Sequence, residues 1–348
     1  MAVTIYDIAQ LTGYSAATIS KALNNQSDIG ERTRLKIVEV ARNLGYIPNQ
    51  GAKALVTKKS WLIGIIYEEI DLHLGIEHPL FVGIMNAFKQ RIEKDGYELI
   101  FIATNLGQKK MTYLEHCRYR GVDGVLILNN DPHSAEVLEV VRSNFPCVSA
   151  NLVYTETTSV TSENVQSSID AVRYLYELGH TRIAHISGPL QDRATAGYER
   201  LEGYRTGLEQ CGLPYREELV VKTDLWTEVC GFRALFQLMD GTERPTALYC
   251  ASDIFYVGVY RAAWNMGLQL PRDLSIVSFD DNEVSRYLRP ALTTWRQDRK
   301  AIGNAAAEQM LAKIAGNPGE LRIFVPVELV ERESCQSLLA EISTLSTQ

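Results

Sequence analysis

Residues 4–23 read TIYDIAQLTGYSAATISKAL, and this stretch decides the fold of the N-terminal region. Thr4 is followed three residues later by the acidic Asp7, which is the pattern of a capped helix start. Gly13 interrupts the apolar periodicity, and Ser15 is suited to cap a second helix. Two short helices joined by a turn that contains glycine form a helix-turn-helix, whose second helix enters the major groove of DNA. The stretch predicts sequence-specific DNA binding, although any small helical hairpin has the same local pattern.

A third helix is expected over residues 31–44, ERTRLKIVEVARNL. Gly45 suits the left-handed end of this helix, and Pro48 prevents its continuation. The residues expected to face the first two helices are Ile37, Val38, Ala41 and Leu44. Three short helices of this kind predict a small independent domain at the N-terminus.

Length and composition limit the class of protein. The chain has 348 residues, of which 46% are hydrophobic, so two or three domains with a substantial core are expected. No apolar run is long enough to span a membrane. The first ten residues do not read as a signal peptide, and the six cysteines are scattered without a Cys-x-x-Cys pair. We therefore expect a cytoplasmic protein with reduced thiols.

The charge is divided unevenly along the chain. The overall formal charge is −7, which does not suggest a DNA-binding protein. Residues 1–60, however, hold eight Lys and Arg residues against four Asp and Glu residues, whereas the rest holds 27 against 38. The N-terminal region is thus at +4 and the remainder at −11. Neutralisation of phosphates is expected to be confined to the N-terminal region.

Beyond Ser60, short apolar runs alternate with amphipathic stretches. Runs such as LIGIIY (62–67) and GVLIL (124–128) are almost wholly apolar and LSIVSFD (274–280) is mostly so, as in strands buried on both faces of a parallel sheet. Two consecutive series of such units predict two similar α/β lobes. Ligands of these sheets bind beyond the carboxyl ends of the strands.

Taken together, these motifs resemble the LacI/GalR family of bacterial repressors. The resemblance rests on the N-terminal helix-turn-helix, the LGYIPN turn (44–49) and the linker that ends in Ala52-x-x-Leu55, and it covers essentially the whole chain. It implies an N-terminal all-α helix-turn-helix headpiece plus an α/β core of two doubly wound parallel-sheet lobes, like a periplasmic binding protein. It also implies a homodimer that binds a pseudo-palindromic operator in double-stranded DNA.

The domain boundaries follow from the resemblance, because periodicity alone does not place them. We expect a headpiece, a hinge and a core over residues 1–48, 49–60 and 61–340. Each lobe is expected to be built from two separate segments of the chain. These are about 61–161 and 292–322 for the first lobe, and about 162–291 and 323–340 for the second.

The resemblance also implies which residues contact DNA. Ala16, Ala17 and Lys21 match the positions from which the family reads bases. Alanines can pack against thymine methyl groups, and Lys21 lacks the rigid fork of the Arg that many members carry. Leu55 matches a leucine that wedges into the minor groove from a hinge that folds on DNA. The candidates for phosphate contacts have capping or packing as their alternative role: Ser15, Thr18, Asn24, Thr33 and Tyr46. The hinge with Ala52, Lys53 and Leu55 could instead be an unstructured linker. The remaining candidates are Thr4, Tyr6 and Asn49.

A small-molecule effector, a sugar or sugar derivative, is expected between the lobes. Arg200 in ERLEGY, Trp226 in LWTEVCGF and Asp280 in SFDD match the family's ligand positions. An aromatic platform suits the C–H face of a sugar, and polar side chains suit its hydroxyls. The alternatives are a core role for Trp226 and an ion pair for Asp280. The other candidates are Phe81, Asn151, Ser252, Asp253 and Arg299.

Two of these positions depart from the family pattern. Ser252 stands where many members have Asn, and it or Asp253 could instead cap the helix that follows. Arg299 stands where an aromatic residue is frequent. Together with Arg200 and Arg193, it suggests a site for a phosphorylated or acidic sugar, because paired arginines suit such groups.

Enzymatic activity is not expected. The sequence has no P-loop, no Gly-x-Ser-x-Gly elbow and no cluster with metal-ligand spacing, so neither a cofactor nor a metal is predicted. A solute carrier is the main rival, and the headpiece argues against it. A protein corepressor is a further partner that the resemblance allows.

Overall fold

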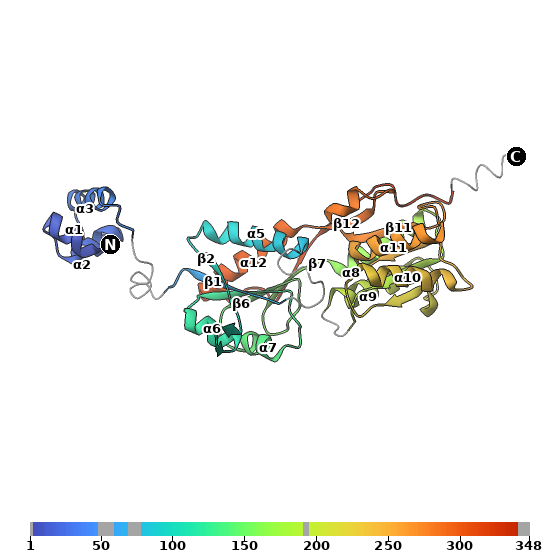
Figure 1. Ribbon diagram of the computed structural model, residues 1–348, viewed down its shortest axis with the longest axis horizontal. Helices are drawn as coiled ribbons and strands as arrows, with labels where there is room; N and C mark the ends of the chain where they lie inside the picture. The colour runs from blue at the N-terminus through green and yellow to red at the C-terminus, as the bar shows by residue number, and fades with distance from the viewer. Residues whose placement is uncertain (1–2, 48–58, 69–77, 191–194, 340–348) are drawn as a thin grey trace. The chain divides into compact units, whose positions relative to one another are not determined.

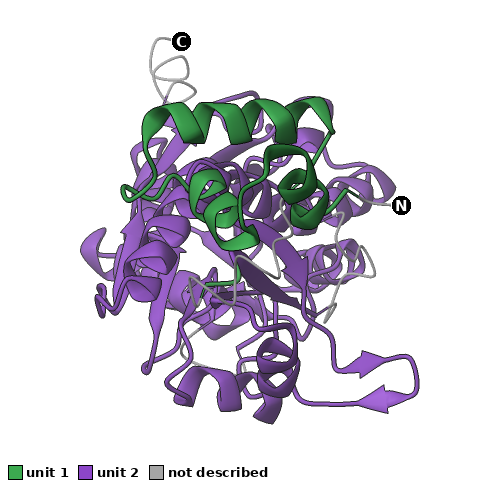
Figure 2. Ribbon diagram, turned by 90° about the vertical axis from the view of Figure 1, so that its left-hand side faces the viewer, with its two compact units in different colours: residues 1–60 green, residues 61–348 purple. Residues whose placement is uncertain are grey.

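The computed structural model describes residues 3–47, 59–68, 78–190 and 195–339. The chain folds as two compact units, residues 1–60 and residues 61–348 (Figure 2). None of the helices in the described part of the chain is long and apolar enough to cross a membrane.

The first unit contains three helices, α1 (Ile5–Thr12), α2 (Ala16–Leu23) and α3 (Glu31–Asn43). The Asp7 carboxylate accepts hydrogen bonds from the Thr4 backbone N–H (2.7 Å) and hydroxyl (2.8 Å), as the capping pattern predicts. Gly13 ends α1 with a φ of 75°, a left-handed conformation that favours glycine. The Ser15 hydroxyl then accepts the Thr18 N–H and starts α2.

The core of this unit is small, and it corrects one expectation. Its buried members are Ile8, Ile19, Ala22, Ile37 and Ala41. Val38 was expected among them, but its side chain is 42% exposed, and Val40 packs on the core instead. The reason is geometric, since positions 37, 40, 41 and 44 share one helical face and position 38 lies about 100° away from 37.

In the second unit, the first lobe is a six-stranded parallel sheet in the order β13-β7-β6-β5-β1-β2. Helices α5 and α12 cover one face, and α6 and α7 cover the other (Figure 1). The strands are β1 (Leu62–Tyr67), β2 (Glu98–Phe101), β5 (Gly124–Leu128), β6 (Cys147–Ala150), β7 (Thr158–Ser162) and β13 (Arg322–Val325). The helices are α5 (Pro79–Glu93), α6 (Tyr113–Arg120), α7 (Ala135–Arg142) and α12 (Arg299–Ile314).

The second lobe repeats this plan with the strand order β14-β12-β11-β10-β8-β9, in which only β14 is antiparallel to its neighbour. Its strands are β8 (Ile183–Ser187), β9 (Val220–Lys222), β10 (Ala247–Cys250), β11 (Ser275–Asp280), β12 (Thr293–Gln297) and β14 (Val327–Val330). Its helices are α8 (Asn164–Glu177), α9 (Ala196–Gln210), α10 (Glu228–Asp240) and α11 (Asp253–Met266).

Both faces of strand β10 are covered by helices, which explains why its sequence is apolar throughout. Leu248 and Cys250 pack towards α10 and α11, whereas Ala247 and Tyr249 pack towards α8 and α9. Alternate residues of a strand point to opposite faces, so a sheet covered on both sides buries all of them. The predicted fold class is confirmed by these two doubly wound sheets.

Two segments lie in the lobe opposite to the one expected. Residues 293–297 were assigned to the first lobe but form β12, which pairs with β11 in the second. Residues 323–325 were assigned to the second lobe but belong to β13, which pairs with β7 in the first. The chain crosses between lobes after β7, after β12 and after β13, and long-range strand pairing rather than local periodicity sets these points.

A short hairpin precedes helix α6 in the first lobe. Strands β3 (Asn105–Leu106) and β4 (Lys109–Lys110) pair across Gly107, which has a φ of 63°. Helix α6 begins only after Thr112, whose hydroxyl accepts the Glu115 N–H while the Glu115 carboxylate accepts the Thr112 N–H. This capping box fixes the start of α6 directly after the hairpin.

Candidate functional site

The outward face of α2 is the candidate DNA-reading surface. Ile19 and Ala22 are buried in the core of the first unit, which leaves Ala17 and Lys21 exposed and Ala16 half-buried on the other side. Small side chains at 16 and 17 would let the backbone of α2 approach a groove closely. The structure therefore presents the three predicted base-facing positions together.

Lys21 is already partnered in this structure. Its Nζ lies 2.5 Å from Asp28 Oδ2, and both side chains are about half exposed. A surface ion pair of this kind contributes roughly 0–1 kcal/mol to stability. Breaking the Lys21–Asp28 pair so that Lys21 can contact DNA would therefore cost little free energy.

The other headpiece candidates divide by exposure. Ser15 caps α2 and exchanges a hydrogen bond with Thr18 (2.9 Å), so its capping role is present. Asn24 is exposed and donates to the Ser20 carbonyl (2.9 Å). Thr4 and Tyr6 are exposed, whereas Thr33 and Tyr46 are half-buried. The hinge candidates lie outside the described residues: Asn49, Ala52, Lys53 and Leu55.

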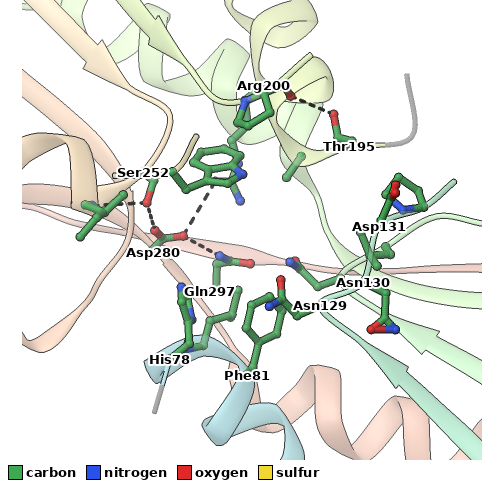
Figure 3. A pocket seen from close by; sticks show the side chains of 18 of the residues that line it. His78, Phe81, Asn129, Asn130, Asp131, Thr195, Arg200, Ser252, Asp280 and Gln297 are labelled. Carbon is green, nitrogen blue, oxygen red and sulfur yellow. Dashed lines mark hydrogen bonds and ion pairs between the residues drawn. The ribbon is translucent and has the colours of Figure 1, made fainter. Parts of the chain in front are cut away.

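A cavity of about 440 Å³ lies between the two lobes of the second unit. This volume falls in the range of small-molecule sites. Its walls come from the N-terminus of α5 and the ends of β5 and β6 on one side, and from the ends of β11 and β12 and the starts of α9 and α11 on the other (Figure 3). The cavity thus occupies the carboxyl edge of both sheets, as parallel topology predicts.

On the second-lobe wall, Asp280 is held by two donors. The Ser252 hydroxyl and Gln297 Nε2 each donate to its carboxylate at 2.6 Å. Asp280 has a φ of 123°, an unusual conformation for a non-glycine residue, and strain of this sort clusters at binding sites. The carboxylate is thereby fixed in place at the rim of the cavity.

Arg200 supports this wall from behind. It is 3% exposed, its Nε donates to Asn164 Oδ1 (3.0 Å) and its Nη1 donates to the Ala251 carbonyl (2.6 Å). Nη1 also lies 3.8 Å from Asp280 Oδ1, and the guanidinium sits over the Phe279 ring. Much of its donor capacity is therefore used within the protein.

Trp226 forms a flat part of the same wall. Its indole stacks on Phe255 with ring centroids 5.4 Å apart and an interplanar angle of 18°. A Cβ at Gly188 would lie only 2.1 Å from the indole, so only glycine fits beneath it. Trp226 packs against the second-lobe core and also lines the cavity, which combines the two roles weighed for it.

The first-lobe wall offers an unpaired donor. Asn130 Oδ1 accepts the Glu68 N–H (3.1 Å), but its Nδ2 is buried and has no hydrogen-bond partner among the described residues. A buried donor without a partner costs about 1–3 kcal/mol, and ligand sites are one place where such groups are kept. Asn130 therefore marks a point where a ligand acceptor would fit.

His78 and Phe81 project from the start of α5 into the same space (Figure 3). Burial lowers the pKa of His78, so the ring is neutral near pH 7. Its Nδ1 accepts the Leu80 N–H (3.3 Å), which places the ring proton on Nε2 as a donor. The His78 and Phe81 rings lie 4.8 Å apart and form an apolar edge beside that donor.

Six of the eight predicted effector residues line the cavity: Phe81, Asn151, Arg200, Trp226, Ser252 and Asp280. Asp253 does not, which corrects that prediction. It is fully buried and accepts hydrogen bonds from Ser285 Oγ (2.6 Å), Thr294 Oγ1 (2.7 Å) and the Asn282 N–H. Its carboxylate ties three segments of the second lobe together.

Arg299 is also absent from the cavity wall, so the predicted anion site is not formed by it. Its guanidinium turns away and donates to the backbone carbonyls of Pro79 and Asp281. Within the described residues, Arg200 is the only Lys or Arg that lines the cavity, whereas Asp131 and Asp280 are carboxylates. Arg193 lies outside the described residues. The described lining therefore argues against an anionic ligand.

Sequence reasoning missed several lining residues that the structure brings in. Asn129, Asn130 and Asp131 directly follow the apolar run GVLIL, so the strand-end rule contained the signal for them. Gln297 carried no such signal, because its position depends on the pairing of β12 with β11. His78 lies three residues before the predicted Phe81 but was not itself predicted.

Comparisons with known proteins bear on both units. Residues 4–49 match the family model for bacterial regulatory proteins of the lacI family, and residues 172–335 match a periplasmic binding protein-like domain. Catabolite control protein A of Priestia megaterium is 32% identical over 322 residues, which cover 90% of this chain and 92% of that protein.

Two solved structures are similar over almost the whole chain. The lac repressor dimer bound to operator and the anti-inducer ONPF has a TM-score of 0.80 and 27% identity, and the match covers 97% of this chain and 100% of that one. The transcriptional regulator CelR in complex with cellobiose has a TM-score of 0.69 and 26% identity, covering 95% of this chain and 99% of that one. The chain belongs to the lacI family of bacterial regulatory proteins.

Proposed function

We propose that the chain is a dimeric transcriptional repressor whose affinity for operator DNA is changed by a small ligand in the inter-lobe cavity. The observation that carries this function is one chain holding both a helix-turn-helix unit with Ala16, Ala17 and Lys21 on its outward face and a cavity walled by two lobes. Its place of action is the cytoplasm, where bacterial DNA lies, and it acts by binding rather than by catalysis.

The effector we propose is an uncharged polyhydroxyl compound, such as a neutral sugar. Trp226 supplies a rigid aromatic wall for an apolar C–H face. Asp280 offers acceptors, and Asn130 Nδ2 and His78 Nε2 offer donors, which together match hydroxyl groups. The cellobiose complex of CelR supports this class, whereas the two lining carboxylates disfavour a phosphate or a sugar acid.

The second copy is proposed to dock partly on the outer face of α10 and α11. Exposed apolar side chains gather there: Val229, Phe236 and Trp264, the last 78% exposed. The Phe232 and Phe236 rings lie 5.1 Å apart, and the Arg261 guanidinium lies 5.2 Å from the Phe232 ring centroid. Aromatic and arginine side chains are enriched at protein interfaces. The dimeric lac repressor supports a dimeric assembly of this chain, and the exposed aromatic side chains are what favour this face.

Binding of the two ligands must be coupled in both directions. If the effector changes operator affinity by some factor, operator DNA changes effector affinity by the same factor. The two lobes can be closer together or further apart. A ligand that contacts both walls binds the closed arrangement more tightly than the open one, so binding shifts the chain towards the closed arrangement.

The test is a selection of binding sites from randomised duplex DNA with the full chain, followed by titration with candidate effectors. The proposal predicts a two-fold symmetric site whose binding is lost when residues 1–60 are deleted. It also predicts that residues 61–348 alone keep effector binding. An asymmetric or absent DNA preference would contradict the repressor function.

A further inference from the structure

Arg299 lies at a crossing between the two lobes. Strand β12 of the second lobe ends at Gln297, and Arg299 is the first residue of α12, which packs on α5 of the first lobe. Its Nη1 donates to the Pro79 carbonyl (3.1 Å), and its Nη2 donates to the Asp281 carbonyl (3.3 Å). Pro79 begins α5, and Asp281 follows β11. One guanidinium thus bonds the backbones of both lobes.

Both carbonyls adjoin side chains that line the cavity. Pro79 lies between His78 and Leu80, and Asp281 follows Asp280 directly. Separation of the α5 end from the β11 end would break at least one of the two Arg299 bonds. The contact therefore acts at the cavity rim, where the walls meet.

The stem of Arg299 has a dedicated space on α5. A Cβ at Gly83 would lie 2.7 Å from Arg299 Cδ and 3.1 Å from its Cβ. Glycine inside a helix is less favourable than alanine by about 1 kcal/mol, so its presence needs a packing reason. At position 83 the reason is passage of the arginine side chain across the helix.

We propose that Arg299 is an inter-lobe latch, a positioning residue that stabilises the arrangement in which both walls face the cavity. Other polar contacts join the lobes elsewhere, such as the Glu199–Arg322 ion pair and the bond from Ser162 to Gln297. Arg299 differs from them because it holds the backbone on both sides of the rim. Its effect on effector affinity rests on the proposed function, whereas its effect on lobe separation does not.

Hydrogen exchange of the full chain without ligand tests the latch directly. Arg299→Met keeps a stem of similar length and removes both donors. We expect backbone amides of residues 82–84 and 281–285 to exchange about tenfold faster, because a local opening loses two hydrogen bonds to a charged donor. Arg299→Lys keeps the charge, but one ammonium replaces the fork, so an intermediate change is expected. Lys300→Met, at the exposed next position of α12, serves as the control.

A double-mutant cycle with Gly83 gives a second measurement. Gly83→Ala alone should displace the Arg299 stem and accelerate exchange in the same two segments. In an Arg299→Ala background the 2.7 Å clash with Cδ is removed and only the 3.1 Å approach to Cβ remains, so Gly83→Ala should accelerate exchange far less or leave it unchanged. Equal effects of Gly83→Ala in both backgrounds would show that the glycine serves another purpose and overturn the packing argument.

The latch is refuted if Arg299→Met leaves both segments unchanged, or if exchange rises uniformly over the core as general destabilisation would produce. It is supported if the increase is confined to the two segments and is absent in Lys300→Met. Neither outcome involves DNA or effector binding, so failure of the latch and failure of the proposed function are distinguishable.

Discussion

The two walls of the cavity differ in how many of their polar groups are already bonded. On the second-lobe wall, Asp280 accepts from Ser252 and Gln297, and Arg200 donates to Asn164 and Ala251. On the first-lobe wall, the Asn130 amide keeps a buried donor with no partner among the described residues. We propose that the second lobe is a preorganised half that would fix ligand orientation, and that the first lobe would gain a bond when a ligand binds.

The largest expected effect is a loss of stability when the buried Asp281 carboxylate, next to Asp280 in the second-lobe wall, is neutralised. Asp281 is 2% exposed and accepts from Arg296 Nε (2.8 Å) and Arg332 Nη2 (2.5 Å). Asp281→Asn removes the charged partner of the mostly buried Arg332, whereas Arg296 keeps its ion pair with Glu328 (3.2 Å). We expect the free energy of unfolding of the core to fall by about 3–5 kcal/mol, measured by urea titration. Glu93→Gln, which breaks the exposed Lys89–Glu93 pair, should change it by less than about 1 kcal/mol.

The same variant has a defined pH dependence. Burial alone would raise the pKa of Asp281, but the hydrogen bonds from Arg296 and Arg332 hold that pKa below its ordinary value. A depressed pKa stabilises the fold above the unfolded-state value, and this stabilisation is lost as the pH falls through the folded-state value. The difference in stability between native chain and Asp281→Asn should therefore be full at pH 7 and shrink below about pH 4. A constant difference would contradict the ionic role.

Trp226→Ala should remove most effector binding. The indole forms a rigid wall, and loss of a buried aromatic anchor weakens binding by about 2–4 kcal/mol, or roughly 30-fold to 1,000-fold. Effector binding is measured by calorimetry, and binding to the selected DNA site should persist. Retained affinity for the effector would place the ligand elsewhere.

Asn130→Ala should have a smaller and more selective effect. The substitution removes a donor that has no partner among the described residues, and the Glu68 N–H keeps a second acceptor in the Asn129 carbonyl (3.2 Å). We expect stability to change by less than about 1 kcal/mol and effector affinity to fall about tenfold. Exposed Asn144 supplies the control, Asn144→Ala. If Asn130→Ala destabilises the core while leaving affinity unchanged, the contrast between the two walls fails.

The smallest effect on stability is expected at the headpiece. Lys21→Ala removes a side chain that is paired only at the surface, so stability of the first unit should hardly change. Affinity for the selected site should fall by about 1–3 kcal/mol, with relaxed preference at one symmetric base-pair position. An unchanged preference in the site selection would remove Lys21 as a base-reading residue.

Sequence patterns predicted the headpiece well because the hydrogen bonds that start its helices join residues close together in the sequence. The Thr4–Asp7 and Ser15–Thr18 contacts span three residues each, so helix starts can be read directly from the sequence. Val38 was misplaced because its neighbours Ile37 and Ala41 set the helical face, and a run of apolar residues conceals which one turns outward.

The cavity was harder to predict because it joins residues far apart in the chain. Trp226, Asp280 and Arg200 could be predicted from strand ends and from the family resemblance. Asp253 and Arg299 occupy equally suggestive positions, but hydrogen bonds to distant segments turn both away from the cavity. The direction of such a side chain depends on pairing partners that no local pattern specifies.

The most direct test of the account is a thermal-shift screen of the full chain against neutral sugars, sugar phosphates and sugar acids, repeated with Trp226→Ala. At about 100 times its dissociation constant a ligand should stabilise the native chain by about 2.7 kcal/mol. The account predicts that a neutral polyhydroxyl compound raises the melting temperature and that Trp226→Ala abolishes the shift. A larger shift from an anionic compound, or a shift that survives Trp226→Ala, would contradict it.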